Sequence, residues 1–187
     1  MPRLGWDAHR HKIFLCSSSW LRELLIAVAL ALAFIIFLYQ PVKVEGTSMQ
    51  PWLADQERIF VNKFVYHFAP IARGDIVVFR YPRDPAKSFI KRVVGLPGDT
   101  VEIRAGRVYV NGLELVEDYV VGHAGGSDYY PPVVVPPDHY YVLGDDRQNS
   151  NDSRTWGPVP RRYIYGKAVF AYWPPERFGS IPEPNRD

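Results

Sequence analysis

"SFIKRVVGLPGDTVEI" (residues 88–103) decides the fold of most of this chain, because two β-type runs meet there at a Pro-Gly-Asp turn. In the first run, strand alternation places Phe89, Lys91 and Val93 on one face and the residues between them on the other. Further runs of the same character are "RIFVNKFVY" (58–66), "DIVVFRYP" (75–82), "RVYVNGLEL" (107–115), "YYVLGD" (140–145) and "KAVFAYW" (167–173). The sequence therefore predicts a mainly β domain with an antiparallel sheet.

The connections between these runs carry structural signals of their own. Asn111-Gly112 lies between two apolar runs and predicts a tight hairpin, because both residues tolerate a positive φ. Residues 122–139 predict either a mobile loop or an extended edge segment. The tail after residue 174 contains few apolar residues that could pack, so we expect it to be loose.

An apolar segment precedes the β domain. Every residue from Leu24 to Tyr39 is apolar or aromatic, and Trp20 and Leu21 extend the segment to 20–39. A helix of this length crosses a hydrocarbon core of about 30 Å, whereas a cleaved secretory signal has an apolar core of about 7–15 residues. No small-residue cleavage site follows, so we expect an uncleaved signal anchor.

Charge on either side of this segment predicts its orientation. Four basic residues stand before it or at its edge: Arg3, Arg10, Lys12 and Arg22. After it, Lys43 is the only nearby base. Because positive charge resists translocation, we expect residues 1–19 to be a cytoplasmic tail, 20–39 a transmembrane anchor and 40–187 an extracytoplasmic domain.

Composition argues against several classes of function. A net charge of +2 in 187 residues disfavours nucleic-acid binding, and the five histidines show no metal-ligand spacing. The only cysteine, Cys16, precedes the anchor, which leaves no thiolate zinc site and no intrachain disulfide. "GDDRQNSNDSRTWG" (144–157) lacks the glycine and glutamate of a calcium loop, and a solvated loop is its default interpretation. The alternative is a scaffold for an active site, because Asp145, Arg147, Asp152 and Arg154 supply alternating charges able to pair. We expect no metal and no cofactor.

Ser48, in "GTSMQ", is a candidate nucleophile that needs a base to accept its proton. His123 lies in a glycine-rich loop and His139 follows two prolines and an aspartate, so neither context predicts a fixed imidazole. Gln50 also replaces the second glycine of a nucleophile elbow. A Ser-His-Asp triad stays open without local support, and Ser48 as a turn or helix cap is the structural alternative.

Lysine is the other candidate base. A solvated lysine, with a pKa of about 10.4, is almost fully protonated at neutral pH, but burial among apolar residues lowers that pKa. Lys91 has Phe89 and Val93 two residues away on either side and is a candidate for such burial. Lys63 and Lys167 share a similar pattern, and for all three the alternative is an amine that extends to solvent at a strand edge.

Three stretches taken in order resemble the type I signal peptidases, in their short single-span branch. They are "GTSMQPWL" after the anchor, "GDIVVFRYP" with "FIKRVVGLPGDTVEI", and "GDDRQNSNDSRTWGPV", and the resemblance runs to about Trp173. It implies an antiparallel β-domain at the membrane surface that removes signal peptides from secreted preproteins through a serine-lysine dyad. Preprotein signal peptides and membrane lipid are then the expected partners.

The resemblance also implies roles for individual residues. Ser48 matches the nucleophile, Lys91 the general base, and Ser150 a serine that hydrogen-bonds the lysine amine. The implied supporting ion pairs are Arg92 with Asp145 and Asp152 with Arg154. Shallow apolar pockets that select small residues before the cut are implied at Val44, Met49, Leu53, Val78 and Ile90.

The chain departs from the family pattern in two places. Gly46 stands where some members have a serine that helps to bind the oxyanion, and Trp52 stands where threonine is common. Trp52 is either an interfacial aromatic in contact with lipid or a packed core residue. Two other functions stay open: a self-cleaving repressor, which would carry a DNA-binding region, and a non-enzymatic membrane-tethered β-domain that binds envelope partners.

Overall fold

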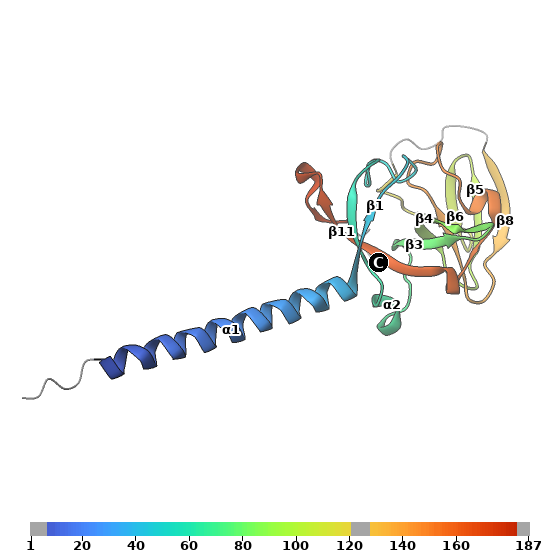
Figure 1. The fold of residues 1–187 in the computed structure, drawn as a ribbon. Coiled ribbons are helices and arrows are strands. Elements are labelled where there is room, and N and C mark those ends of the chain that lie inside the picture. The colour runs from blue at the N-terminus through green and yellow to red at the C-terminus, as the bar shows by residue number, and fades with distance from the viewer. Residues whose placement is uncertain (1–6, 121–127, 183–187) are drawn as a thin grey trace, which may run out of the picture. The chain divides into compact units, whose positions relative to one another are not determined.

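The computed structural model describes residues 7–120 and 128–182, with side chains from residue 20, and divides the chain into two compact units (Figure 1). The first unit contains helix α1 (Asp7–Leu38). Its segment Trp20–Leu38 has a mean hydropathy of 2.5 and is not buried, so it is long and apolar enough to cross a membrane. The helix fits a single span and ends one residue before the predicted limit at Tyr39.

The second unit, residues 39–187, is built from two antiparallel sheets (Figure 1). The larger sheet has the order β1-β2-β11-β3-β4-β9-β10 with β12 paired to β11, and the smaller has the order β7-β6-β5-β8. The strands are β1 (Tyr39–Lys43), β2 (Arg58–Asn62), β3 (Ile76–Tyr81), β4 (Asp84–Gly95), β5 (Thr100–Arg104), β6 (Arg107–Val110), β7 (Leu113–Glu114), β8 (Tyr129–Val134), β9 (His139–Leu143), β10 (Val159–Pro160), β11 (Ile164–Trp173) and β12 (Gly179–Ser180). The helices are α2 (Val65–Phe68), α3 (Ser153–Trp156), η1 (Arg161–Tyr163) and η2 (Pro175–Arg177). The mainly antiparallel β prediction is confirmed.

The strand predicted over 58–66 is shorter than expected. β2 ends at Asn62, because the Asn62 side-chain oxygen accepts hydrogen bonds from the backbone N–H groups of Phe64 and Val65 at 2.9 and 3.0 Å. These bonds turn the chain into α2, as expected for an asparagine that competes with the strand ladder. β1 was not predicted, because its first residue, Tyr39, continues the apolar run of the helix.

The predictions of a tight hairpin at 111–112 and of an edge segment within 122–139 agree better with the structure than the prediction for 58–66. Asn111 and Gly112 have φ values of 53° and 83° and connect β6 to β7, which confirms the tight turn. Part of 122–139 is an extended edge segment, because β8 pairs with β5 at the border of the smaller sheet. Residues 121–127, which include His123, lie outside the described residues.

The expectation of a loose tail is wrong for residues 175–181. β12 pairs with β11, and Ile181 is buried in the core. Arg177 forms an ion pair with the buried Glu57 at 3.0 Å and donates hydrogen bonds to two backbone carbonyls of the segment after Ser48. Polar contacts hold this tail in place, so its low apolar content misled the prediction. Residues 183–187 lie outside the described residues.

Both faces of β4 are buried at its C-terminal half. Val93 packs in one apolar cluster with Val77 of β3, whereas its neighbour Val94 packs in another that the larger sheet shares with β5 and β6. The alternation predicted for this strand therefore holds, but each face meets a core. As a result Lys91 and Arg92 are only 4% and 1% exposed.

Candidate active site

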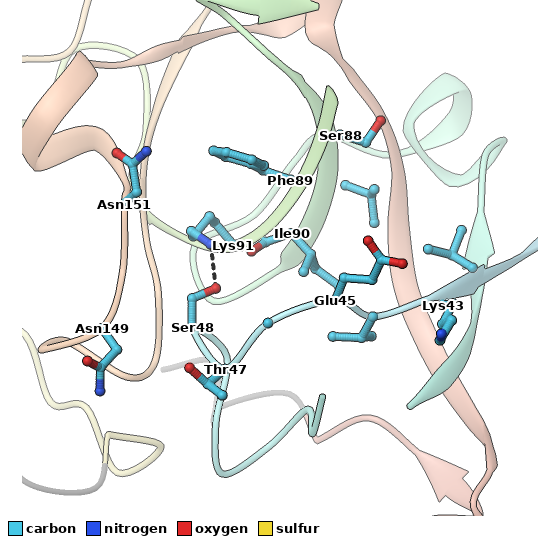
Figure 2. Close-up of a pocket in the computed structure, with 14 residues that line it drawn as sticks. Lys43, Glu45, Thr47, Ser48, Ser88, Phe89, Ile90, Lys91, Asn149 and Asn151 are labelled. Atoms are coloured by element: carbon cyan, nitrogen blue, oxygen red, sulfur yellow. Dashed lines mark hydrogen bonds between the residues drawn. The ribbon is translucent and has the colours of Figure 1, made fainter. Parts of the chain in front are cut away.

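Ser48 lies in a tight turn a few residues after β1 (Figure 2). Gly46 has a φ of 96°, a conformation that favours glycine, and its N–H donates to an Asp55 carboxylate oxygen at 2.7 Å. Met49 and Leu53 are 1% and 0% exposed and anchor the turn in an apolar cluster. Buried side chains therefore hold the turn in place, while Ser48 itself stays half-buried.

Lys91 of β4 is the hydrogen-bond partner of Ser48. Its Nζ lies 2.6 Å from Ser48 Oγ and donates to the Ile90 carbonyl at 3.0 Å (Figure 2). Burial lowers the pKa of Lys91 to about 8, although the carboxylates of Asp152 and Asp145 oppose this shift. An amine with this pKa loses its proton far more readily near neutral pH than a solvated lysine does.

The other two lysines with a similar sequence pattern have different surroundings. Lys167 of β11 is also buried, but its Nζ pairs with an Asp75 carboxylate oxygen at 2.8 Å. Lys63 is half-buried and lines a different hollow of the domain. Lys91 is the lysine that the structure brings to Ser48.

Both implied ion pairs are present: Arg92–Asp145 ties the 144–157 loop to β4, and Asp152–Arg154 lies within the loop. Arg92 donates to the two carboxylate oxygens of Asp145 at 2.8 and 2.7 Å, and Arg154 donates to both oxygens of Asp152 at 2.8 Å. Asp152 also accepts from the Gly144 N–H at 3.1 Å. Asp145 and Asp152 are fully buried, so their charges depend on these partners. The loop is thus a fixed wall of the site rather than a solvated segment.

Gly144 allows this wall to approach Ser48 closely. A Cβ at position 144 would lie 2.5 Å from the Ser48 carbonyl oxygen and 2.6 Å from Ser150 Cβ, which no side chain tolerates. The Asp146 N–H donates to the Ser48 carbonyl at 3.1 Å. Ser150 Oγ is buried and has no hydrogen-bond partner among the described residues, so the implied bond to Lys91 is not formed here.

A second buried polar cluster supports the site and was missed from the sequence. Arg147 forms a two-bond ion pair with Glu117, which also accepts from the Tyr119 hydroxyl at 2.8 Å. The Arg92 guanidinium lies 4.1 Å from the centre of the Tyr119 ring, and the Trp52 indole N–H donates to the Tyr119 carbonyl at 2.6 Å. Trp52 is half-buried and tied to the domain by this bond. Arg147 stands in a charged loop, but nothing near Glu117 in the sequence signals a partner 30 residues away.

A groove of about 440 Å³ runs past Ser48 and Lys91 (Figure 2). Lys43 and Glu45 lie on one side of it and Asn149 and Asn151 on the other. Its apolar lining includes Val42, Val44, Val78, Phe89 and Ile90. Of the predicted substrate contacts, Val44, Val78 and Ile90 line the groove, whereas Met49 and Leu53 lie beneath it because they are fully buried in the core.

The described residues contain no group of three His, Cys, Asp or Glu side chains that could hold a metal ion. His139 Nδ1 lies 2.8 Å from the Pro137 carbonyl, at an exposed position. A hydroxyl in hydrogen-bond contact with a buried amine, as in Ser48 and Lys91, is an arrangement suited to nucleophilic catalysis.

Comparisons with known proteins give the family of this chain and indicate a serine peptidase. The family model described as "Signal peptidase, peptidase S26" matches residues 17–173. A signal peptidase I of Leptolyngbya laminosa is 42% identical over 85% of this chain and 81% of its own length. Signal peptidase I P of Bacillus subtilis subsp. natto is 39% identical over 88% and 95% of the two chains.

A crystal structure of a signal peptidase I from Enterococcus faecalis V583 is also similar, with 34% identity and a TM-score of 0.47 over 53% of this chain and 97% of that chain. The chain belongs to the signal peptidase family. This family is membrane-associated and removes signal peptides from preproteins. Family membership favours a signal peptidase over both the non-enzymatic tethered domain and the self-cleaving repressor.

Proposed function

We propose that this protein is a membrane-anchored signal peptidase in which Ser48 is the nucleophile and Lys91 the general base. The observation that carries this proposal is the 2.6 Å contact between Lys91 Nζ and Ser48 Oγ, at an amine whose pKa is lowered to about 8. At pH 7.5 about a quarter of such an amine is neutral, against about 0.1% for a lysine with an ordinary pKa. Only the neutral form accepts a proton.

The reaction has two stages, as in other enzymes with a covalent intermediate. In the first, Ser48 Oγ attacks the scissile carbonyl carbon while Lys91 Nζ takes the hydroxyl proton. The Lys91 ammonium then gives this proton to the leaving amine, which releases the mature protein and leaves the signal peptide as an ester on Ser48. In the second stage, water loses a proton to Lys91 and attacks the ester carbon; the Lys91 ammonium then returns a proton to Ser48 Oγ as the signal peptide leaves with a free carboxyl group.

The tetrahedral intermediates need a donor for their oxyanion. We assign the Ser48 backbone N–H to this role, because it forms no other hydrogen bond within the described part of the chain. The Gly46 N–H is already bound to Asp55. Ser150 is positioned beside Gly144 and is the residue we assign to orient the Lys91 amine once substrate has entered, since its hydroxyl has no other partner in the described residues.

The groove supports an extended substrate with small residues before the cut. Its floor is formed by Val44, Val78 and Ile90, which leave room for small apolar side chains near Ser48. The ion pairs Arg92–Asp145 and Asp152–Arg154 hold the opposite wall in position. We assign them a positioning role, because preorganised geometry keeps the nucleophile and base in reach of each other.

The apolar helix would place this site at a membrane. We assign residues 20–39 as the anchor, residues 1–19 to the cytoplasm and residues 40–187 to the extracytoplasmic side, because the basic residues precede the span. A preprotein whose signal peptide crosses the same membrane would then present its cleavage site on the side of Ser48. Membrane lipid and preproteins are the partners that follow from this arrangement.

Cleavage of a preprotein with alanines before the cut, by the full-length protein in detergent, tests the proposal. Ser48→Ala should lower kcat/KM by at least about a thousandfold, because the nucleophile is lost. Ser180→Ala, an exposed serine on β12, is the matched control and should cleave normally. A Ser48→Ala protein that cleaves at the wild-type rate would refute the assignment.

A further inference from the structure

A second hollow of the β domain shares no residue with the groove. It has a volume of about 400 Å³ and lies where α2 and η1 meet β11. Its lining combines three basic side chains with aromatic and aliphatic ones: Lys63, Phe64, Tyr66, His67, Arg161, Ile164 and Tyr165. No aspartate or glutamate belongs to this lining. The hollow therefore has the composition of an anion site with an apolar wall.

The cations of this hollow are not neutralised. Within the described residues, neither Lys63 nor Arg161 has a carboxylate at ion-pair distance. The guanidinium of Arg161 is held in place, because it donates to the carbonyls of Ile164 and Tyr66 at 3.1 Å each and lies over the Tyr66 ring. These bonds occupy two of its five N–H donors, so the others remain for a ligand.

The position of the hollow along the chain indicates the source of that anion. In the β1–β2 register Tyr39 pairs with Asn62, and Lys63 follows directly. Tyr39 is also the first residue after the apolar helix, so the end of β2 lies at the level where the chain would leave a bilayer. This step rests on the membrane anchor of the proposed function.

Phe68 gives an independent indication of an interface. It ends α2, four residues after Phe64, and is 89% exposed. A large apolar side chain exposed next to a basic hollow is typical of segments that insert into the headgroup region while cations contact phosphates.

We infer that this hollow binds the phosphate of an anionic phospholipid headgroup. Lys63 and the free donors of Arg161 would contact the phosphate oxygens through charge-assisted hydrogen bonds, and His67 would add a ring N–H. Phe68 would enter the acyl region beside the same lipid. The site would thus hold the β domain at a fixed height above an anionic bilayer.

Binding of short-chain lipids to the full-length protein in neutral detergent tests this inference without any peptide substrate. Dihexanoyl phosphatidylglycerol should bind at least about fivefold more tightly than dihexanoyl phosphatidylcholine, because each cation near an anionic headgroup contributes about this factor. Arg161 remains in the double variant Lys63→Gln/His67→Gln, so the loss of the Lys63 cation should lower this preference about fivefold. Lys87→Gln, which changes an exposed lysine on β4, is the matched control and should keep it.

Three outcomes would overturn the inference. One is a wild-type protein without preference for the anionic lipid. Another is a double variant whose preference equals that of the wild type. The third is glycerol 3-phosphate binding as tightly as the anionic lipid, which would indicate a soluble phosphate as ligand. Preprotein cleavage in neutral detergent, measured on the same samples, should be equal for wild type and double variant. A wild-type protein that prefers the anionic lipid but does not cleave the preprotein would count against the peptidase assignment alone.

Discussion

Lys91 and Lys167 occupy equivalent places on two strands that flank β3. Both pair with Val77, Lys91 from β4 and Lys167 from β11, and they are 4% and 7% exposed. Their partners differ. Lys167 Nζ lies 2.8 Å from an Asp75 carboxylate oxygen, whereas Lys91 Nζ contacts the Ser48 hydroxyl and the Ile90 carbonyl.

Burial alone therefore does not distinguish the two lysines. A buried ammonium in contact with a carboxylate is compensated, but one whose direct contacts are neutral groups is compensated less for its desolvation. The carboxylates nearest to Lys91, Asp145 and Asp152, are bound to Arg92 and Arg154. The two ion pairs therefore also keep these carboxylates from pairing with the Lys91 amine.

Removal of each lysine in turn should give the largest contrast. Lys91→Met should lower kcat/KM for a preprotein by at least about a thousandfold, because no base remains for Ser48. Lys167→Met should cleave at the wild-type rate once corrected for its folded fraction. Steady-state cleavage in detergent, with the folded fraction from near-UV circular dichroism, measures both. An inactive but fully folded Lys167→Met protein would contradict the prediction that cleavage needs Lys91 and not Lys167.

The same two variants should change stability in opposite directions. Lys167→Met breaks the buried Lys167–Asp75 ion pair by removing one of its two charges and should lower the free energy of unfolding by about 3–5 kcal/mol. Lys91→Met removes a buried amine whose pKa is about 8 in the folded protein and about 10.5 when unfolded. It should raise the free energy of unfolding at pH 7 by up to about 3 kcal/mol.

The stability difference between Lys91→Met and the wild type should depend on pH. Between pH 8 and 10.5 the unfolded chain binds a proton that the folded protein has lost, so the wild type gains stability as pH rises through this range. The advantage of Lys91→Met should disappear above pH 10.5. Urea unfolding followed by tryptophan fluorescence measures it, and a constant advantage at all pH values would contradict a neutral Lys91.

Activity should also depend on the protonation of Lys91, and this effect should be smaller than the loss caused by Lys91→Met. The neutral fraction of an amine with a pKa of about 8 falls about tenfold from pH 9 to pH 7, so kcat/KM should fall equally. The Lys167→Met protein should show the same pH profile, since Asp75, the ion-pair partner of Lys167, is not part of the site. A flat profile of kcat/KM over this range would exclude Lys91 as the base.

The smallest predicted effect concerns Ser150. Its buried hydroxyl has no partner within the described residues, so Ser150→Ala should leave the free energy of unfolding almost unchanged. If the hydroxyl orients the Lys91 amine during the reaction, kcat/KM should fall about fivefold, the value of one modest hydrogen bond. Equal activity of Ser150→Ala and wild type from pH 7 to 9 would remove Ser150 from the mechanism.

Local patterns in the sequence were sufficient for much of the fold. The apolar run 24–39, the alternation in 88–96 and the Asn111-Gly112 turn each specify their structure through neighbouring residues. β1 and the ordered tail were not predictable in this way. Each depends on pairing with a distant strand, and the tail depends as well on the Arg177–Glu57 ion pair.

The sequence by itself named Ser48 as a possible nucleophile and left Lys63, Lys91 and Lys167 as comparable bases until the family motifs were considered. Tertiary structure separates these lysines, because it brings Asp75 to Lys167 and Ser48, 43 residues away along the chain, to Lys91. It also pairs Glu117 with Arg147 behind the site. The proton affinity of a buried amine is set by the groups that surround it in space, and strand alternation specifies only which face it shares with its neighbours in sequence.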